Sequence, residues 1–251
     1  MENSRPILHN KTAFDQVLRD YHISDHARDV LAHIPFVAFS GVAGGGRNTV
    51  INRLVDTGRY VFAVSDTTRP PKLRDGKMEQ EGVNYYFRKE EEMLKDIQNG
   101  EFVEAEVIHN QQVSGMSVRE LERVAATGKI PVNEFEFGGI KNVVKAKPDT
   151  IVIGLLPPSY ERWMERLFGR EEIDRQEFLN RLATAEKVLE TMLHEPYFKL
   201  VVNESIDECV LQVQRIVEEG IYTESDDSRA RQVAEELLSR VRTQLEEAGT
   251  R

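Results

Sequence analysis

The feature of this sequence that most constrains its fold is a short apolar run that ends in a cluster of glycines. Residues 34–40 are mostly apolar, as in a strand buried within a parallel sheet. Residues 47–57 have a helical pattern, and Gly58 follows as a stop signal. A strand, a glycine turn and a helix together direct backbone N–H groups and the positive end of the helix toward one point. The segment therefore predicts a phosphate-binding loop.

The glycine cluster has the spacing of the Walker A motif up to the position of its lysine. Arg47 stands at the lysine position, Asn48 at the next position, where a hydroxyl residue is usual, and Thr49 follows. Arginine keeps the positive charge and can bind phosphate through a planar fork. The predicted nucleotide-binding residues of the loop are Gly41, Gly44, Gly45, Gly46, Arg47, Asn48 and Thr49. The alternative is a glycine-rich turn that binds no ligand.

Strand and helix patterns alternate along the rest of the chain. Further strands are expected at residues 60–65, 102–108, 130–135, 151–156 and 200–203, and helices lie between most of them. Residues 66–82 are expected to form a loop, and Ser117 with Glu120 has the pattern of a capping box. This order predicts an α/β fold with a parallel sheet core and helices on both faces.

Composition excludes several classes of protein. The formal net charge is -10, which argues against binding to nucleic acid through a basic surface. No apolar run approaches the roughly 20 residues of a membrane helix, and the first ten residues have no secretory signal pattern. The single cysteine, Cys209, suits a reducing compartment and is expected to be a small buried residue without a catalytic role. We therefore expect a cytoplasmic protein without membrane or nucleic-acid partners.

A second group of cations follows the second predicted strand. Ser65, Arg69, Lys72 and Arg74 fall within ten residues of an otherwise acidic chain, and prolines stiffen the turn. The arginine fork suits a second phosphate group. The alternative is a solvated loop.

Several separated motifs now occur in a fixed order. After the glycine loop come Ser-x-Thr-Thr-Arg-x-Pro at 65–71, Asn-Tyr-x-Phe at 84–87, Gly-Glu-Phe-x-Glu at 100–104 and Arg-Leu-x-Gly-Arg at 166–170. This order resembles the guanylate kinase family, from about residue 36 to residue 219. The resemblance implies a P-loop kinase fold at 35–220, with a nucleoside monophosphate (NMP)-binding region at 66–135 and a lid with its following helix at 159–195.

The resemblance also implies a role for individual residues. The glycine loop and Asn203 are expected to bind ATP, with Mg2+ as the metal and Thr49 as a weak metal candidate. The residues expected to bind GMP are Ser65, Arg69, Lys72, Tyr85, Glu104 and Glu136. Glu104 is expected to accept hydrogen bonds from the N1 and N2 donors of guanine. Arg47, Arg166, Arg170 and Arg181 are expected to stabilise the transferring phosphoryl group. An alternative for the lid arginines is a charged helix face paired with neighbouring glutamates.

Some positions depart from the family pattern. Besides Arg47, Ser114 and Met116 stand where the family has a tyrosine and a hydroxyl residue, and Gly138 stands where it has glutamine. The resemblance predicts ATP-dependent phosphorylation of GMP or dGMP. The alternatives are an impaired guanylate kinase-like module that binds nucleotide or phosphopeptide, and a kinase of another small phosphorylated acceptor.

Segments at both ends extend beyond the resemblance. Residues 1–34 are expected to be helical, and residues 221–251 are expected to form one amphipathic helix. Packing against the domain or a homodimer contact would account for their apolar faces.

Overall fold

The computed structural model describes residues 7–74, 76–108, 110–135, 137–169 and 173–249, and the chain divides into two compact units. Unit 1 comprises Met1–Phe36, Val61–Asn133 and Gly138–Thr150, and unit 2 comprises Val37–Tyr60, Glu134–Phe137 and Ile151–Arg251. The chain passes between the units within β2 (Tyr60–Phe62), at the end of β9 (Ile130–Glu134), at the start of α6 (Phe137–Ala146) and elsewhere in loops.

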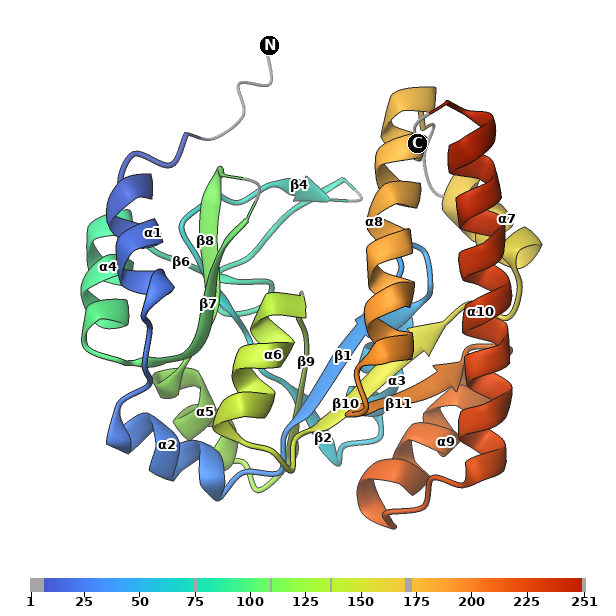
Figure 1. The fold of residues 1–251 in the computed structure, drawn as a ribbon. Coiled ribbons are helices and arrows are strands. Elements are labelled where there is room, and N and C mark those ends of the chain that lie inside the picture. The colour runs from blue at the N-terminus through green and yellow to red at the C-terminus, as the bar shows by residue number, and fades with distance from the viewer. Residues whose placement is uncertain (1–6, 75, 109, 136, 170–172, 250–251) are drawn as a thin grey trace. The chain divides into compact units, whose positions relative to one another are not determined.

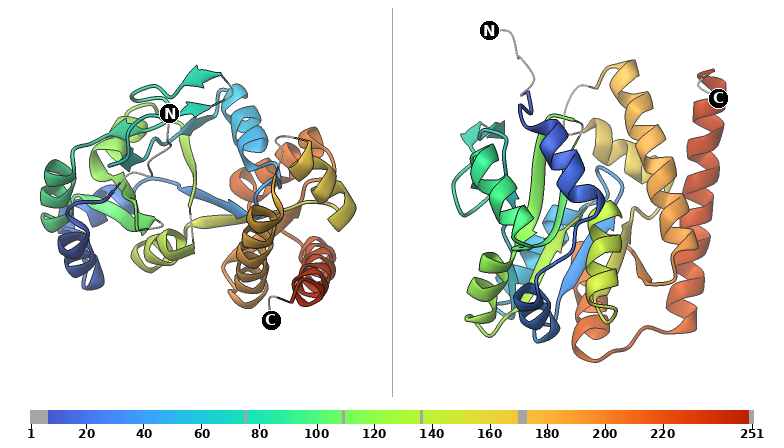
Figure 2. Two further views of the ribbon diagram at one scale, coloured as in Figure 1. Left: turned by 90° about the horizontal axis from the view of Figure 1, so that it is seen from above. Right: turned by 60° about the vertical axis from the view of Figure 1, so that its left-hand side comes forward.

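Unit 2 is built on a parallel sheet. Its elements are β1 (Val37–Gly41), α3 (Arg47–Asp56), β10 (Ile151–Leu156), α7 (Tyr160–Phe168), α8 (Arg175–His194), β11 (Phe198–Val202), α9 (Ile206–Glu218) and α10 (Glu224–Glu247). Strand β10 pairs in parallel with β1 on one side and β11 on the other. Nearly every residue of these strands is buried, because helices cover both faces. Helices α3 and α9 pack together on one face, and α8 and α10 lie on the other (Figure 1, Figure 2). The predicted α/β fold with a parallel core is confirmed.

Unit 1 contains short strands and helices. They are α1 (Lys11–Arg19), α2 (Asp25–Ala32), β3 (Asp66–Thr67), β4 (Leu73–Arg74), β5 (Lys77–Met78), β6 (Tyr86–Phe87), α4 (Glu90–Gln98), β7 (Phe102–Ile108), β8 (Gln112–Ser117) and α5 (Val118–Ala125), with most of β2, β9 and α6. One sheet has the order β6-β3-β8-β7, with β7 and β8 antiparallel. Helix α1 lies beside α4, and α2 lies beside α5 (Figure 1).

The structure corrects two expectations about local structure in unit 1. The expected loop at 66–82 contains β3 and the β4–β5 hairpin, and strand β8 and helix α6 had no strong sequence signal. The capping box at Ser117 is also wrong, because its side chain makes no capping bond and instead donates to Asp66. The Glu120 carboxylate accepts from the backbone N–H of Val64, 2.7 Å away. Buried partners distant in the sequence have displaced the local pattern.

Both terminal segments are integral to their units. Leu8 and Phe14 are buried in one core cluster of unit 1. In unit 2, the apolar face of α10, with Leu237 and Val241, packs against α8 and β11. The apolar faces that suggested packing or a homodimer are used here within the chain.

Cys209 of α9 is buried as expected, and burial raises the pKa of its thiol to about 12. None of the helices in the described part of the chain is long and apolar enough to span a membrane.

Candidate functional site

The glycine loop lies at the carboxyl end of β1 and leads into α3. Gly44 and Gly46 have φ angles of 80° and 99°, a region that L side chains rarely adopt. A Cβ atom on Gly46 would lie 2.3 Å from Asn203 Nδ2. The loop therefore requires glycine at this point for its conformation and for close packing against Asn203.

Side chains from α7 and from the end of β11 hold the backbone of this loop. Trp163 Nε1 donates to the Ala43 carbonyl at 2.7 Å, and Asn203 Nδ2 donates to the Gly45 carbonyl at 2.9 Å. The Gly45 N–H donates to the Val42 carbonyl at 3.0 Å, and this tight turn with positive φ at Gly44 and Gly46 has the form of an anion-binding loop. Trp163 was not predicted, since nothing in the local sequence connects it with the loop.

Two buried polar atoms beside the loop have no hydrogen-bond partner among the described residues. They are Arg166 Nη1, a donor, and Asn203 Oδ1, an acceptor. Arg166 Nη2 donates to the Asn203 backbone carbonyl at 3.1 Å, and burial lowers the pKa of Arg166. Unpaired buried groups are costly, so this donor and acceptor fit a ligand that carries both functions, as a purine edge does. The loop and these atoms together suit a purine nucleotide.

Arg47, in the first turn of α3, is directed toward a carboxylate of its own unit. Its Nε lies 3.6 Å from Glu134 Oε2 at the end of β9, and both side chains are partly exposed. Thr49 is exposed in the same turn of α3. The described residues contain no group of three or more His, Cys, Asp or Glu side chains able to hold a metal ion. A Mg2+ ion here would therefore depend mainly on nucleotide phosphates and water, as is usual for this ion.

The other predicted arginines of unit 2 differ in their surroundings. Arg181 of α8 pairs with Glu177 one turn earlier at 2.8 Å, as the charged-face alternative expects. Arg170 lies outside the described residues, as does Glu136, which was predicted to bind GMP.

In unit 1, Arg69 is enclosed by its own chain. Its guanidinium makes two hydrogen bonds with Glu79, 2.5 and 3.0 Å long, and lies 4.6 Å from the centre of the Tyr85 ring. Glu79 also accepts from the backbone N–H of Lys72, whose side chain is exposed. The fork predicted to hold a phosphate thus already binds a carboxylate, which sequence reasoning missed. Ser65, nearby in the sequence, accepts from Asn133 Nδ2 at 3.0 Å.

Glu104 on β7 is a buried carboxyl group. Its Oε1 accepts from the Met116 backbone N–H at 3.0 Å. Its pKa is raised to about 8, first by burial and then by Glu106, while the Met116 bond opposes the shift. Glu106 occupies the space beside Gly138, where a Cβ atom would lie 1.5 Å from its Oε1. Gly138 thus leaves room for a second carboxylate on the same strand.

Ser114 and Met116 of β8 lie on the strand paired with β7. The Ser114 hydroxyl lies 2.8 Å from the Thr67 hydroxyl, and Met116 is fully buried. Ser117 is occupied by Asp66 rather than by a capping bond.

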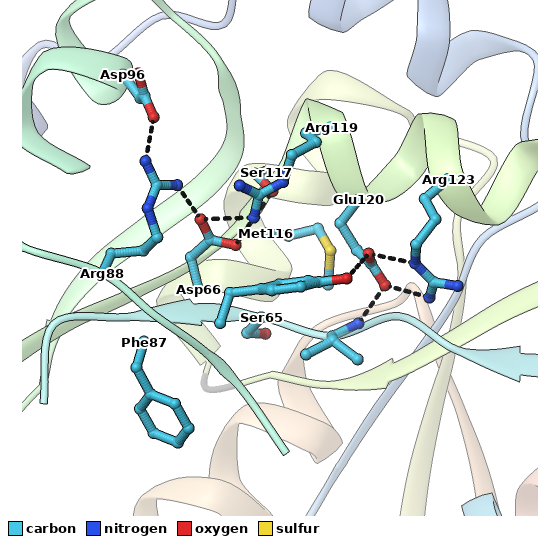
Figure 3. Close-up of polar contacts among 12 residues, drawn as sticks. Ser65, Asp66, Phe87, Arg88, Asp96, Met116, Ser117, Arg119, Glu120 and Arg123 are labelled. Atoms are coloured by element: carbon cyan, nitrogen blue, oxygen red, sulfur yellow. Dashed lines mark hydrogen bonds and ion pairs between the residues drawn. The ribbon is translucent and has the colours of Figure 1, made fainter. Parts of the chain in front are cut away.

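A network of charged side chains surrounds the buried Asp66 in β3 (Figure 3). Asp66 accepts from Arg88 at 2.6 Å and from Arg119 at 2.9 Å, and Arg88 also binds Asp96. Burial raises the pKa of Asp66 although both arginines oppose the shift. The network joins the segment containing Ser65 to α4 and α5.

The fold and the loop define a P-loop protein of the α/β class that suits a purine nucleotide. The family model described as Guanylate kinase matches residues 35–220. The guanylate kinase of Corynebacterium diphtheriae is 35% identical over 72% of this chain and 93% of that protein. Human guanylate kinase is 32% identical over 74% of this chain and 93% of that protein.

Two further comparisons agree with this match. This chain matches guanylate kinase 1 of Arabidopsis thaliana at 29% identity and spans about half of that protein, 46% of its length. The crystal structure of guanylate kinase from Anaplasma phagocytophilum has a TM-score of 0.55 and 26% identity, covering 77% of this chain and 89% of that one. The chain belongs to the guanylate kinase family.

Proposed function

We propose that this protein transfers the γ-phosphoryl group of ATP to GMP or dGMP and forms ADP and the nucleoside diphosphate. The observation that carries the proposal is Glu104, a buried carboxyl group with one described hydrogen bond, from Met116. A carboxylate has about four acceptor positions, so it retains capacity for the paired N1 and N2 donors of guanine. Adenine presents no such pair of donors.

The remaining residues divide into three sets by role. Ser65, Arg69, Lys72, Tyr85 and Glu136 hold the acceptor nucleotide together with Glu104. The glycine loop, Asn48, Thr49 and Asn203 hold ATP, and Mg2+ neutralises the phosphates when bound. Arg47, Arg166, Arg170 and Arg181 stabilise the charge of the transferring group. Phosphoryl transfer depends mainly on positioning and on such cations.

One observation favours a second candidate, a catalytically impaired binding module. Arg47 replaces the loop lysine and lies against Glu134, and Arg69 is already paired with Glu79. A phosphate bound by either arginine must then share it with a carboxylate of the chain. A module that binds nucleotide or phosphopeptide without transfer is consistent with such a site.

A coupled assay of ADP production tests the proposal. ATP and Mg2+ are incubated with GMP, dGMP, AMP, UMP or CMP, and Arg166→Ala and Arg47→Lys serve as companion variants. We expect ADP formation with GMP and dGMP alone, and a loss of at least about a hundredfold in Arg166→Ala. Silence with every monophosphate at high enzyme concentration would reject the kinase, and restored activity in Arg47→Lys would then identify the loop arginine as the cause.

A further inference from the structure

The segment before the family match is part of the core of unit 1. Leu8 and Phe14 are buried in one cluster with Met93, Ile97 and Phe102. The cluster also includes Ala105 and Val113, so it lies against strands β7 and β8. The N-terminal segment therefore packs directly on the strand that carries Glu104.

Tyr21, which follows α1, makes the most specific contact of this segment. Its hydroxyl donates to the Phe102 carbonyl and accepts from the Phe102 N–H at 3.0 Å. Strand β7 is an edge of its sheet, so one hydroxyl satisfies both backbone groups of an edge residue. The backbone N–H of Ser24 donates to the Gly100 carbonyl at 3.1 Å and fixes the chain just before this point.

The contact falls where the strand is irregular. The pairing of β7 with β8 shifts register between Phe102 and Glu104. The irregularity lies between Phe102, which is paired with Ser117, and Glu104, which is paired with Met116, and such a bulge re-aims the side chains beyond it. The direction of the Glu104 side chain thus depends on how Phe102 is held.

We infer that Tyr21 is a positioning residue for Glu104. Its hydroxyl fixes the backbone of Phe102 beside the bulge and thereby determines the direction of the Glu104 carboxyl group that binds guanine. The inference rests on the proposed function of Glu104 as the guanine-binding residue. Burial raises the pKa of Tyr21 to about 12, so the hydroxyl keeps its proton and remains a donor throughout the neutral range.

The test compares two nucleotides that differ in one group. IMP has the N1 donor of GMP but lacks the 2-amino group, so the ratio of their affinities reports on contact with the N2 donor. Calorimetric titration of the full chain with each nucleotide gives this ratio without requiring turnover. In Tyr21→Phe we expect the preference for GMP over IMP to fall roughly five- to tenfold, because one hydroxyl hydrogen bond is worth about that factor.

Two control variants separate positioning from stability. Phe14→Leu weakens the same core cluster without touching the Phe102 backbone, so it lowers the Tm of the protein and leaves the ratio unchanged. Tyr222→Phe removes a hydroxyl that bonds both backbone groups of Leu200 in β11, an edge strand of unit 2. It is the same chemical change, and we expect it to leave the GMP to IMP ratio unchanged.

The outcomes are distinct. A lower ratio of GMP to IMP affinity in Tyr21→Phe, with no change in the two control variants, supports the inference. In a protein that already carries Glu104→Gln, adding Tyr21→Phe should not change the ratio further. An unchanged ratio in a folded Tyr21→Phe protein, or an equal fall in Phe14→Leu, overturns the inference and leaves the proposed function intact. Absence of GMP binding by the unchanged chain overturns the proposed function and the inference with it.

Discussion

The arginines beside the predicted acceptor residues of unit 1 and Arg166 beside the glycine loop of unit 2 have different partners. In unit 1 each arginine near the predicted acceptor residues is paired with carboxylates of the same chain: Arg69 with Glu79, Arg88 with Asp66 and Asp96, Arg119 with Asp66, and Arg123 with Glu120. In unit 2, Arg166 and Asn203 each hold a buried atom that finds no partner among the described residues.

This difference separates two ways of preparing a binding site. In unit 1 the protein's own acids hold the cations in place, so an incoming phosphate must share them. In unit 2 the loop and its neighbours are incomplete, and a ligand would supply the missing partners. Removing a carboxylate partner of the unit 1 arginines should therefore act mainly on stability, and perturbing the glycine loop of unit 2 should act mainly on ATP affinity.

The largest expected effect on stability concerns Glu79. In Glu79→Gln, Arg69 keeps its buried charge but loses its carboxylate partner, so the free energy of unfolding should fall by about 3 kcal/mol. Denaturant titration followed by circular dichroism measures this. The matched control is Glu165→Gln, which breaks the exposed pair with Arg162 and should cost less than about 1 kcal/mol. Equal effects in the two variants would show that the Arg69 pair contributes no more than a surface pair.

The next effect concerns the loop of unit 2. In Gly46→Ala the added Cβ atom meets Asn203 at a residue with positive φ, so ATP affinity should fall about a hundredfold, or roughly 2.7 kcal/mol. Gly58→Ala is the matched control, because Gly58 also has a positive φ, 78°, but no atom within 4 Å of an added Cβ. It should cost about 1–2 kcal/mol of stability and leave ATP affinity unchanged. Titration calorimetry and denaturant unfolding separate the two, and normal ATP affinity in Gly46→Ala would contradict the close packing described.

A third effect is the pH dependence of GMP binding through Glu104. Since the folded-state pKa of Glu104 is raised to about 8, the carboxyl is largely protonated at pH 7, and guanine's donors require the carboxylate. Affinity for GMP should increase between pH 6 and 8 by up to about tenfold per unit, with proton release on binding. Calorimetry in buffers of different ionisation enthalpy detects the proton, and Glu104→Gln should abolish the dependence.

The same shift affects folding with the opposite sign. The folded protein holds this proton more tightly than the unfolded chain, so stability falls as pH rises from the unfolded pKa near 4.5 toward 8. In Glu104→Gln this part of the pH dependence should disappear. A pH profile of Tm that is identical in the two proteins would argue against the raised pKa.

The smallest expected effect is that of Glu134 on Arg47. Because the pair is partly exposed and 3.6 Å long, Glu134→Gln should change stability by less than about 1 kcal/mol. Loss of the negative charge should favour phosphate binding, so ATP affinity should rise a few-fold. Thermal unfolding measures the change in stability, and calorimetry measures the change in ATP affinity. A fall in ATP affinity would instead show that Glu134 contributes to binding the metal or the nucleotide.

Local sequence patterns predicted the helices, strands and turns that depend on interactions between neighbouring residues. The glycine loop followed from the strand, the glycines and the helix beside it, and β7 and β10 occupy the predicted residues. The pairs of Glu79 with Arg69 and of Asp66 with Arg88 could not be predicted, because they join residues 10 and 22 positions apart that lie in no common helix or strand and meet through tertiary packing. Ser117 shows the same limit. Its local sequence fits a capping box, but its hydroxyl donates to the buried Asp66, 51 positions away.

The buried thiol of Cys209 allows local unfolding of unit 2 to be measured without an introduced label. The chain has one cysteine, it lies in α9 of unit 2, and a thiol with a pKa of about 12 is almost never a thiolate at neutral pH. Reaction of Cys209 with a thiol reagent therefore requires unit 2 to open around α9. The rate of this reaction reports local unfolding of unit 2 and does not report local unfolding of unit 1. Cysteines introduced on the surface can be labelled selectively for the same reason, without removing the native one.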